Sequence, residues 1–406
     1  MAESLSRVHA SSSVRAAVRT GADRIVHEAS SLVDGRRVGV LTNHTGRLSD
    51  GRPLVDAIVQ SGLARVTALF GPEHGIQGDV HDGAAVDHSV HPRHGIPVYS
   101  LYGKTHKPTP EMLRDVDVFV CDIQDVGARF YTFVSTIALA QEACAEAGIP
   151  FVILDRPNPI RGVDVDGPVR DGSLRSFVGW MPIPVTHGMT IGELARMWNG
   201  EGWLANGVCG KIEVVRMDGW TRSQWYDETG LSWISPSPNM RTLDTAIVYP
   251  GTCFIEGTSA AEGRGTDAPF ELVGAPWMNA GAVMERFAKF AVPGVSLSAE
   301  RFTPRDIPGV AGNPKFADQE CQGVRITVTD RAALRPVRLG VALTAAIKRV
   351  HPAEMELRHR RFDILVGSAD VRHELEQHAD PADICARWTG PLEAFSAIRS
   401  KYLLYS

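Results

Sequence analysis

The chain has 406 residues, 44% of them hydrophobic and 22% charged, which is ordinary for a soluble globular protein. A single hydrophobic core rarely grows beyond roughly 250–300 residues, so this length predicts two domains. The formal net charge of -5, without long runs of one sign, argues against nucleic acid or anionic lipid as a partner.

The N-terminal segment, residues 1–30, reads as a polar leader without an apolar run of signal-peptide length. No other segment reaches the ~20 apolar residues that a membrane span requires. The 6 cysteines are scattered and form no CxxC pair, which predicts reduced thiols. From these features we expect a cytoplasmic protein that does not enter a membrane.

From residue 37 onward, short apolar runs alternate with segments of helical spacing. Strands are predicted at 37–42, 66–70, 116–121 and 151–154. Helices are predicted at 53–61 and 132–147, and the second is closed by Gly148 and Pro150. Strand, helix and strand at this spacing predict an α/β fold with a Rossmann-like, doubly wound parallel sheet.

The pattern changes near residue 249, where Tyr-Pro-Gly interrupts it. It continues with a predicted helix at 279–291, a strand at 324–328, a long amphipathic helix at 337–350, then 362–366 and closing helices. We therefore predict a Rossmann-like N-terminal domain over 31–247, expected to carry the catalytic groups, and a smaller C-terminal α/β domain over 248–406.

In a doubly wound sheet, ligands bind outside the carboxyl ends of the strands. Polar clusters that follow the predicted strands should therefore converge; they lie at 43–45, 73–74, 122–129 and 155–158. A dinucleotide site would need a GxGxxG turn after the first strand, where this chain has Thr-Asn-His-Thr-Gly. No nucleotide and no other cofactor is expected.

Glu73 is the first candidate for a catalytic residue. It lies in Gly71-Pro72-Glu73-His74-Gly75, directly after a predicted strand, where proline and glycine favour a turn. Its carboxylate would then project into the crevice at the strand ends. The alternative is an ordinary surface-loop acid beside a histidine.

Residues 122–131 combine carboxylates, an arginine and a phenol after the next predicted strand. A glycosidase needs one carboxylic acid to protonate the leaving oxygen, and usually a second anionic group across the reacting carbon. Asp122 or Asp125 could supply the second group. Alternatively, one of them caps the following helix and pairs with Arg129.

A glycine-rich loop at 253–266 holds two acids, Glu256 and Glu262, together with Arg264. Glycines permit close backbone approach to a ligand, but such loops also occur as plain turns with surface charges.

Five histidines fall between 74 and 94, namely His74, His81, His88, His91 and His94. Their spacing fits no recognised metal-ligand pattern, so a polar loop is expected and no metal is predicted.

Several motifs together resemble the exo-β-N-acetylmuramidase (NamZ) family. They are GPEHGIQGD, DIQDVGARFYTF, LDRPNPI, HGMTIGELA, SPN and YPGTCFIEGTSAAEGRGTDAPFE. The resemblance runs from about residue 37 to the C-terminus and implies a Rossmann-like domain joined to a smaller α/β domain, with the active site in the cleft between them. It also implies release of N-acetylmuramic acid (MurNAc) from the non-reducing ends of peptidoglycan fragments.

Carried over to this sequence, the resemblance implies two groups of site residues. The implied catalytic residues are Glu73, His74, Asp125, Tyr131 and Glu256. The implied substrate-binding residues are Asn43, Arg129, Asn158, His187, Asn239, Thr258 and Arg264. Arg129 or Arg264 is expected to bind the lactyl carboxylate that distinguishes MurNAc from N-acetylglucosamine (GlcNAc).

The chain departs from the family pattern in two respects. It is richer in histidine around residues 81–94, and the sequence shows no export signal of the kind that many family members carry. A cytoplasmic protein and an exported one that has lost its leader both stay open. Two other functions stay open from the sequence. One is a non-catalytic protein that binds cell-wall sugars; the other is a metal-dependent hydrolase that uses the histidines of residues 74–94. The sequence does not predict an oligomeric state.

Overall fold

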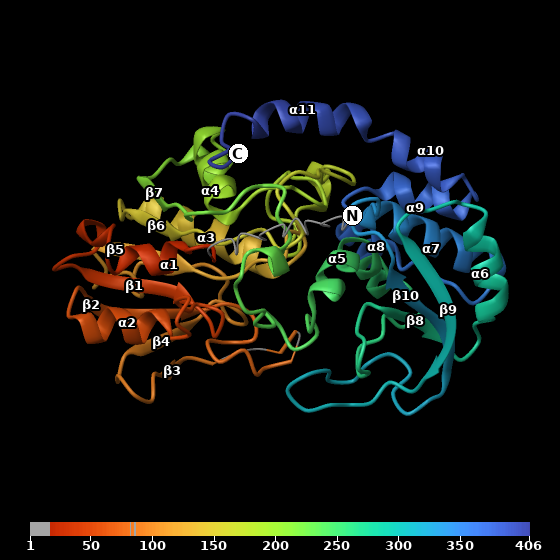
Figure 1. Cartoon of the computed structure of the whole chain (residues 1–406), viewed down its shortest axis with the longest axis horizontal. Coiled ribbons are helices and arrows are strands. Elements are labelled where there is room, and N and C mark those ends of the chain that lie inside the picture. The colour runs from red at the N-terminus through yellow and green to blue at the C-terminus, as the bar shows by residue number, and fades with distance from the viewer. Residues whose placement is uncertain (1–16, 82, 85–86) are drawn as a thin grey trace, which may run out of the picture.

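The computed structural model describes residues 17–81, 83–84 and 87–406 and has two lobes, each built around a β-sheet (Figure 1). The first lobe holds a mainly parallel sheet with helices on both faces, and the second a small antiparallel sheet flanked by helices. The predicted α/β fold class is confirmed.

Within the described residues, the first sheet has seven strands in the order β3-β4-β2-β1-β5-β6-β7. Neighbouring strands are parallel except for β3 and β4. The parallel strands follow the order 3-2-1-4-5-6 of Rossmann sheets, with the switch point between β1 and β5. The strands are β1 Arg37–Thr42, β2 Arg65–Gly71, β3 Ser89–Val90, β4 Pro97–Ser100, β5 Val118–Asp122, β6 Phe151–Leu154 and β7 Ile212–Val215.

Helices cover both faces of this sheet because its strands are apolar on both sides. In β5, Val118 and Val120 face the core that includes α1 (Gly21–Ile25) and α2 (Leu54–Ser61). Phe119 and Cys121 face the opposite core, which includes α3 (Thr132–Glu146) and α4 (Ile191–Gly200). The four predicted strands correspond to β1, β2, β5 and β6, and the two predicted helices to α2 and α3.

The second lobe has a three-stranded antiparallel sheet in the order β8-β10-β9, counted over the described residues. Its elements are α5 Leu243–Thr252, β8 Leu272–Ala275, α6 Ala280–Ala288, β9 Val295–Phe302, β10 Cys321–Val328, α7 Pro336–Val350, α8 His359–Val366, α9 Ala369–Glu376, α10 Pro381–Ala386 and α11 Thr389–Arg399. The elements predicted at 279–291, 324–328 and 337–350 are confirmed as α6, β10 and α7. Residues 362–366 form the end of α8.

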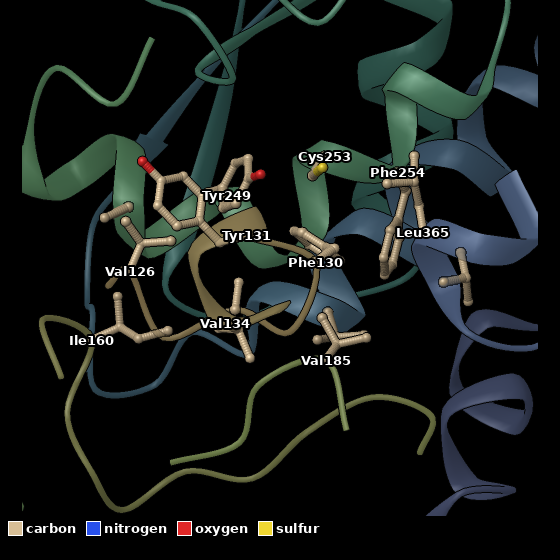
Figure 2. Packing of buried hydrophobic residues seen from close by; sticks show 14 of the residues in the cluster. Val126, Phe130, Tyr131, Val134, Ile160, Val185, Tyr249, Cys253, Phe254 and Leu365 are labelled. Carbon is tan, nitrogen blue, oxygen red and sulfur yellow. The ribbon is translucent and has the colours of Figure 1, made fainter. Parts of the chain in front are cut away.

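One hydrophobic core continues from the first lobe into the second. Phe130 of the first lobe packs edge-on against Tyr249 and Phe254 of the second, and Leu365 belongs to the same cluster (Figure 2). Helix α5 crosses the predicted boundary at 247–248, so this division of the chain remains a prediction. The continuous core holds the two lobes against each other.

Both ends of the described chain pack on the first lobe. Residues 1–16 of the expected polar leader lie outside the described residues, but Ala22 and Ile25 of α1 are fully buried, so the described part of this segment belongs to the lobe. Helix α11 leads away from the second lobe, and the C-terminus lies near α4 (Figure 1). None of the helices in the described residues is long and apolar enough to cross a membrane.

Candidate active site

A cavity of about 390 Å³ lies between the two lobes and is lined by residues of both. This volume falls within the roughly 300–1,000 Å³ usual for small-molecule sites. The lining residues with ionisable or hydroxyl groups include Glu73, His74, Tyr131, Thr132, Glu256, Glu262, Arg264, Lys315 and Arg361. A cavity with charged groups on both walls therefore lies where the active site is expected.

Glu73 projects from the turn after β2 and is only 7% exposed. The backbone N–H of Gly83 donates to its Oε1 at 2.9 Å, and the Thr132 hydroxyl donates to its Oε2 at 2.6 Å. Thr132 is the first residue of α3, so β2 and α3 together hold the carboxyl group. Both oxygens are oriented, and the side chain lines the cavity.

His74 has a backbone φ of +71°, a left-handed conformation that is uncommon outside glycine. Its ring Nδ1 lies 2.7 Å from the carbonyl oxygen of Val80. Since a carbonyl only accepts, this contact places the Nδ1 proton on His74 and fixes the ring. Such conformations gather at functional sites, where the surrounding structure maintains them.

Aromatic rings from both lobes meet at the cavity. The ring of Tyr131 lies edge-on to that of Tyr249, with centroids 6.1 Å apart, and Tyr249 packs edge-on against Phe270 at 4.8 Å. Figure 2 shows Tyr131, Tyr249 and Phe130 side by side next to Cys253. Burial raises the pKa of the Tyr249 phenol well above its usual range, so it keeps its proton at neutral pH.

The wall contributed by the second lobe carries a cluster of five charged side chains, which we call the charged wall: Glu256, Glu262, Arg264, Lys315 and Arg361. Glu256 pairs with two arginines: its Oε1 forms an ion pair with Arg264 Nη1 at 2.9 Å, and its Oε2 accepts from Arg361 Nη2 at 2.8 Å. Glu262 lies 3.4 Å from Arg264 Nη1 and 3.1 Å from Lys315 Nζ.

Two acids in the 122–131 segment have structural roles. Asp125 does not line the cavity, since its Oδ2 accepts the backbone N–H of Gly127 at 2.7 Å and thereby closes a local turn. Asp122 is fully buried and accepts from Arg156 at 2.6 and 2.9 Å. The Oδ2 of Asp125 also lies 3.7 Å from His187 Nε2, and neither acid pairs with Arg129. The catalytic role of Asp125 stays a prediction.

Arg129 also does not line the cavity. Its side chain is 1% exposed and donates to the carbonyl oxygens of Pro168, at 3.0 Å, and of Leu365 in α8. Burial and the neighbouring Arg170 lower its pKa to about 9, so the guanidinium remains protonated at neutral pH. Arg129 is therefore a buried cation that joins the two lobes through backbone carbonyls, and its role in substrate binding stays a prediction.

The other substrate-binding residues predicted from the first lobe and from 239–258 do not line the cavity. Their side chains form hydrogen bonds with neighbouring segments of the chain. The Oδ1 of Asn43 accepts the N–H and the hydroxyl of Thr45, and the Nδ2 of Asn158 donates to Met189 O at 3.0 Å. Thr258 donates to Ile255 O at 2.9 Å, and Asn239 donates to Val310 O at 2.8 Å. His187 is fully buried and accepts the N–H of Met189 at 3.2 Å.

The histidines of residues 81–94 are distributed over different partners. His88 accepts the backbone N–H of Ser100 at 3.0 Å, whereas His94 contacts Asp56 of α2 at 2.6 Å and stacks on His91. Among the residues that the structure describes, no group of three or more potential ligands could hold a metal ion.

Two family models cover nearly the whole chain. The model described as "Exo-beta-N-acetylmuramidase NamZ, N-terminal" matches residues 38–244, and its C-terminal counterpart matches residues 247–405. The chain belongs to the NamZ family. The two models meet inside α5 (Leu243–Thr252), close to the predicted boundary.

Relatives of this NamZ-family chain include one curated protein and two solved structures. The peptidoglycan β-N-acetylmuramidase NamZ of Bacillus subtilis (strain 168) is 42% identical over 389 residues, which covers 96% of this chain and 91% of the relative. Two crystal structures of DUF1343 family proteins from Bacteroides fragilis match with TM-scores of 0.87 and 0.79, at 33% and 32% identity. Each match covers 96% of this chain and 99% of the relative.

Several residues that line the cavity were not among the predicted site residues, including Thr132, Glu262, Lys315 and Arg361. Thr132 and Glu262 lie in motifs that carry the family resemblance, so a closer reading of those motifs could have found them. Lys315 lies in a Gly-Asn-Pro-Lys loop, and Arg361 in the basic run Arg358-His359-Arg360-Arg361. Neither segment has a pattern that separates a site residue from solvent-exposed charge.

Proposed function

We propose that the protein is an exo-acting glycoside hydrolase that releases β-1,4-linked MurNAc from the non-reducing ends of peptidoglycan fragments such as MurNAc-GlcNAc. The observation that carries this proposal is the oriented carboxyl group of Glu73, which lines a cavity between the two lobes of a NamZ-family chain. The curated Bacillus subtilis relative, named a peptidoglycan β-N-acetylmuramidase, supports the same substrate class.

In the proposed reaction, protonated Glu73 donates its proton to the glycosidic oxygen as the bond from that oxygen to the anomeric carbon breaks. GlcNAc leaves as a neutral alcohol, and water supplies the hydroxyl group at the anomeric carbon of MurNAc. The proton lost by that water returns to the carboxylate of Glu73. Thr132 and Gly83 keep the carboxyl group in place through both steps.

Glu256 is the carboxylate that we place on the opposite side of the reacting carbon. It lies on the charged wall, whereas Glu73 comes from the first lobe. Because two arginines bind its two oxygens, Glu256 is held as an anion and can stabilise positive charge that develops on the sugar. Its proposed role is electrostatic.

Product analysis tests the substrate assignment. The protein should cleave MurNAc-GlcNAc and leave GlcNAc-MurNAc intact, because only the first presents MurNAc at its non-reducing end. Binding of MurNAc-GlcNAc without any turnover would instead indicate a non-catalytic sugar-binding protein. A rate that falls after chelation and recovers with added metal would indicate a metal-dependent hydrolase.

The Glu73→Gln variant tests whether Glu73 is the general acid, because the rate loss it causes should depend on the leaving group of the substrate. General acid catalysis typically contributes ~10²–10⁴-fold, and we expect a loss of that size in kcat with MurNAc-GlcNAc. A 4-nitrophenyl glycoside should lose much less in its bond-cleaving step, since nitrophenolate leaves without a proton; pre-steady-state kinetics measures that step.

The matched control is Glu285→Gln, the same change at an exposed position of α6 outside the cavity, which should leave both rates unchanged. Near-wild-type disaccharide turnover by folded Glu73→Gln protein would remove Glu73 from the mechanism.

A further inference from the structure

Three cations line the cavity on the charged wall: Arg264, Lys315 and Arg361. They face two carboxylates, Glu256 and Glu262, so the wall keeps one positive charge. A sugar with a single carboxylate could match that charge, provided that one of the three cations has hydrogen-bond donors to offer.

Lys315 has none to offer. Its ammonium group donates to the carbonyl oxygens of Ile255 at 2.9 Å, Glu256 at 3.2 Å and Ala260 at 2.7 Å, and it forms an ion pair with Glu262 Oε2 at 3.1 Å. The three carbonyl oxygens account for the three donors of an ammonium group. Lys315 therefore holds the loop that carries Glu256.

Arg264 is compensated by two acids. Its Nη1 lies 2.9 Å from Glu256 and 3.4 Å from Glu262, and its guanidinium covers the ring of Phe270 at 4.9 Å. The side chain is 20% exposed. Its charge is thus largely balanced within the wall.

Arg361 is more exposed than Arg264 and is compensated by fewer acids. Its side chain is 47% exposed, and its one hydrogen bond to another described residue runs from Nη2 to Glu256 Oε2. A guanidinium has five N–H donors in a planar fork that suits a carboxylate. Arg361 also shares one face of α8 with Leu365, four residues later, and both line the cavity.

We infer that Arg361 binds the lactyl carboxylate of MurNAc and is the residue that selects this sugar over GlcNAc. The inference rests on the proposed function for the identity of the sugar. Glu256 holds the guanidinium through one of its five donors and leaves the others for the ligand. Arg264 remains a partner of the two acids.

Calorimetric titration with MurNAc and with its lactyl amide tests this inference without requiring turnover. The measured quantity is the acid preference, the Kd of the amide divided by that of the acid. In the wild-type protein the acid should bind more tightly, because charge-assisted hydrogen bonds are stronger than neutral ones. Arg361→Gln should weaken MurNAc binding about 10–100-fold and bring the acid preference close to one.

Two further variants separate recognition from structural damage. Arg360→Gln removes the same charge from the neighbouring position of α8, which does not line the cavity, and should keep the wild-type acid preference. Glu256→Gln removes an anion beside Arg361 and should preserve or increase the acid preference, whereas general disruption of the wall would lower it.

Two results would overturn the inference: a wild-type acid preference in Arg361→Gln, or loss of that preference in Arg264→Gln alone. Disaccharide hydrolysis by the wild-type protein is measured separately. Failure there, with the acid preference confirmed, would refute the proposed function and leave the binding role of Arg361 in place.

Discussion

Thr132 illustrates how one side chain at this site positions another. Its hydroxyl donates to Glu73 Oε2 at 2.6 Å from the first turn of α3, and Gly83 holds the other oxygen. Thr132 is thus a positioning residue for the proposed general acid. The polar residues after the other strands act similarly on neighbouring backbone, as Asp125 does on Gly127.

Replacement of Thr132 by valine keeps the shape of the side chain and removes the hydroxyl. As Glu73 gives up its proton, the Thr132 hydroxyl bonds a developing carboxylate. A hydrogen bond to a charged group contributes about 1.5–3 kcal/mol, so we expect kcat/KM for MurNAc-GlcNAc to fall about 10–100-fold. Thr132→Ser retains the hydroxyl and should stay near the wild-type rate. Equal rates for the valine and serine variants in steady-state assays would show that the hydrogen bond is unnecessary.

At the scale of elements, the crossing of α5 and α7 positions the loop that carries Glu256. The two helices touch through glycines, and a Cβ atom placed on Gly340 of α7 would lie only 2.3 Å from the carbonyl oxygen of Gly251 in α5. Helix α5 continues directly into the short 3-10 helix Cys253–Gly257, which contains Glu256. The close crossing therefore helps to fix the position of Glu256, the first residue of the charged wall along the chain.

Gly340→Ala should lower the free energy of unfolding, although the same change in an open helix raises it by up to ~1 kcal/mol. The added methyl group meets backbone that cannot rotate away, and overpacking of this kind costs about 1–3 kcal/mol. Gly390→Ala in α11 is the matched control, because no atom lies within 4 Å of its added Cβ, and it should be neutral or stabilising. Urea unfolding curves compare the variants; destabilisation by both or by neither would contradict the expectation.

At the scale of the whole molecule, the C-terminal residues bind back to the first lobe. The Tyr405 hydroxyl donates to Asp155 Oδ2 at 2.6 Å, and the backbone N–H of Leu404 donates to Glu193 Oε1 at 2.7 Å. Asp155 ends up fully buried at the end of β6 and also accepts from Thr190 and Gly192. The tail and the continuous core thus connect the lobes at separate places.

Burial raises the pKa of Asp155 from 3.8 to about 6. Between these values the folded protein holds a proton that the unfolded chain has lost, so this group's contribution to the free energy of unfolding falls as the pH rises. Above pH ~6 the buried carboxylate is ionised, and the hydrogen bond from Tyr405 becomes charge-assisted and about twice as strong. Tyr405→Phe should therefore cost about 1 kcal/mol at pH 5 and about 2–3 kcal/mol at pH 8.

Urea unfolding at both pH values measures this difference. Tyr402→Phe is the matched control, since the Tyr402 hydroxyl donates to Glu201 at 2.7 Å and hydrogen bonds from Tyr402 and Lys401 hold the pKa of Glu201 below its usual value. Glu201 is ionised at both pH values, so the effect of Tyr402→Phe should not depend on pH. A pH-independent cost for Tyr405→Phe would show that the titration of Asp155 is not linked to the tail.

Four of the seven described strands of the first sheet, and the position of Glu73 after one of them, could be predicted from the sequence alone. Apolar runs such as 37–42 and 151–154 match β1 and β6 in full because buried parallel strands are apolar on both faces. The Pro-Glu-His-Gly turn placed Glu73 beyond a strand end, and such turns depend on local residue preferences. Both signals are local, so they can be read from neighbouring residues.

Only the tertiary structure decided which polar residues face the cavity. Arg129 lies in a candidate motif and Arg361 in a basic run outside all of them, yet Arg129 is buried against carbonyl oxygens and Arg361 lines the cavity. Their partners, Leu365 and Glu256, lie more than a hundred residues away along the chain. Whether a guanidinium meets carbonyl groups or an open cavity depends on how the lobes pack, and no local sequence pattern encodes that packing.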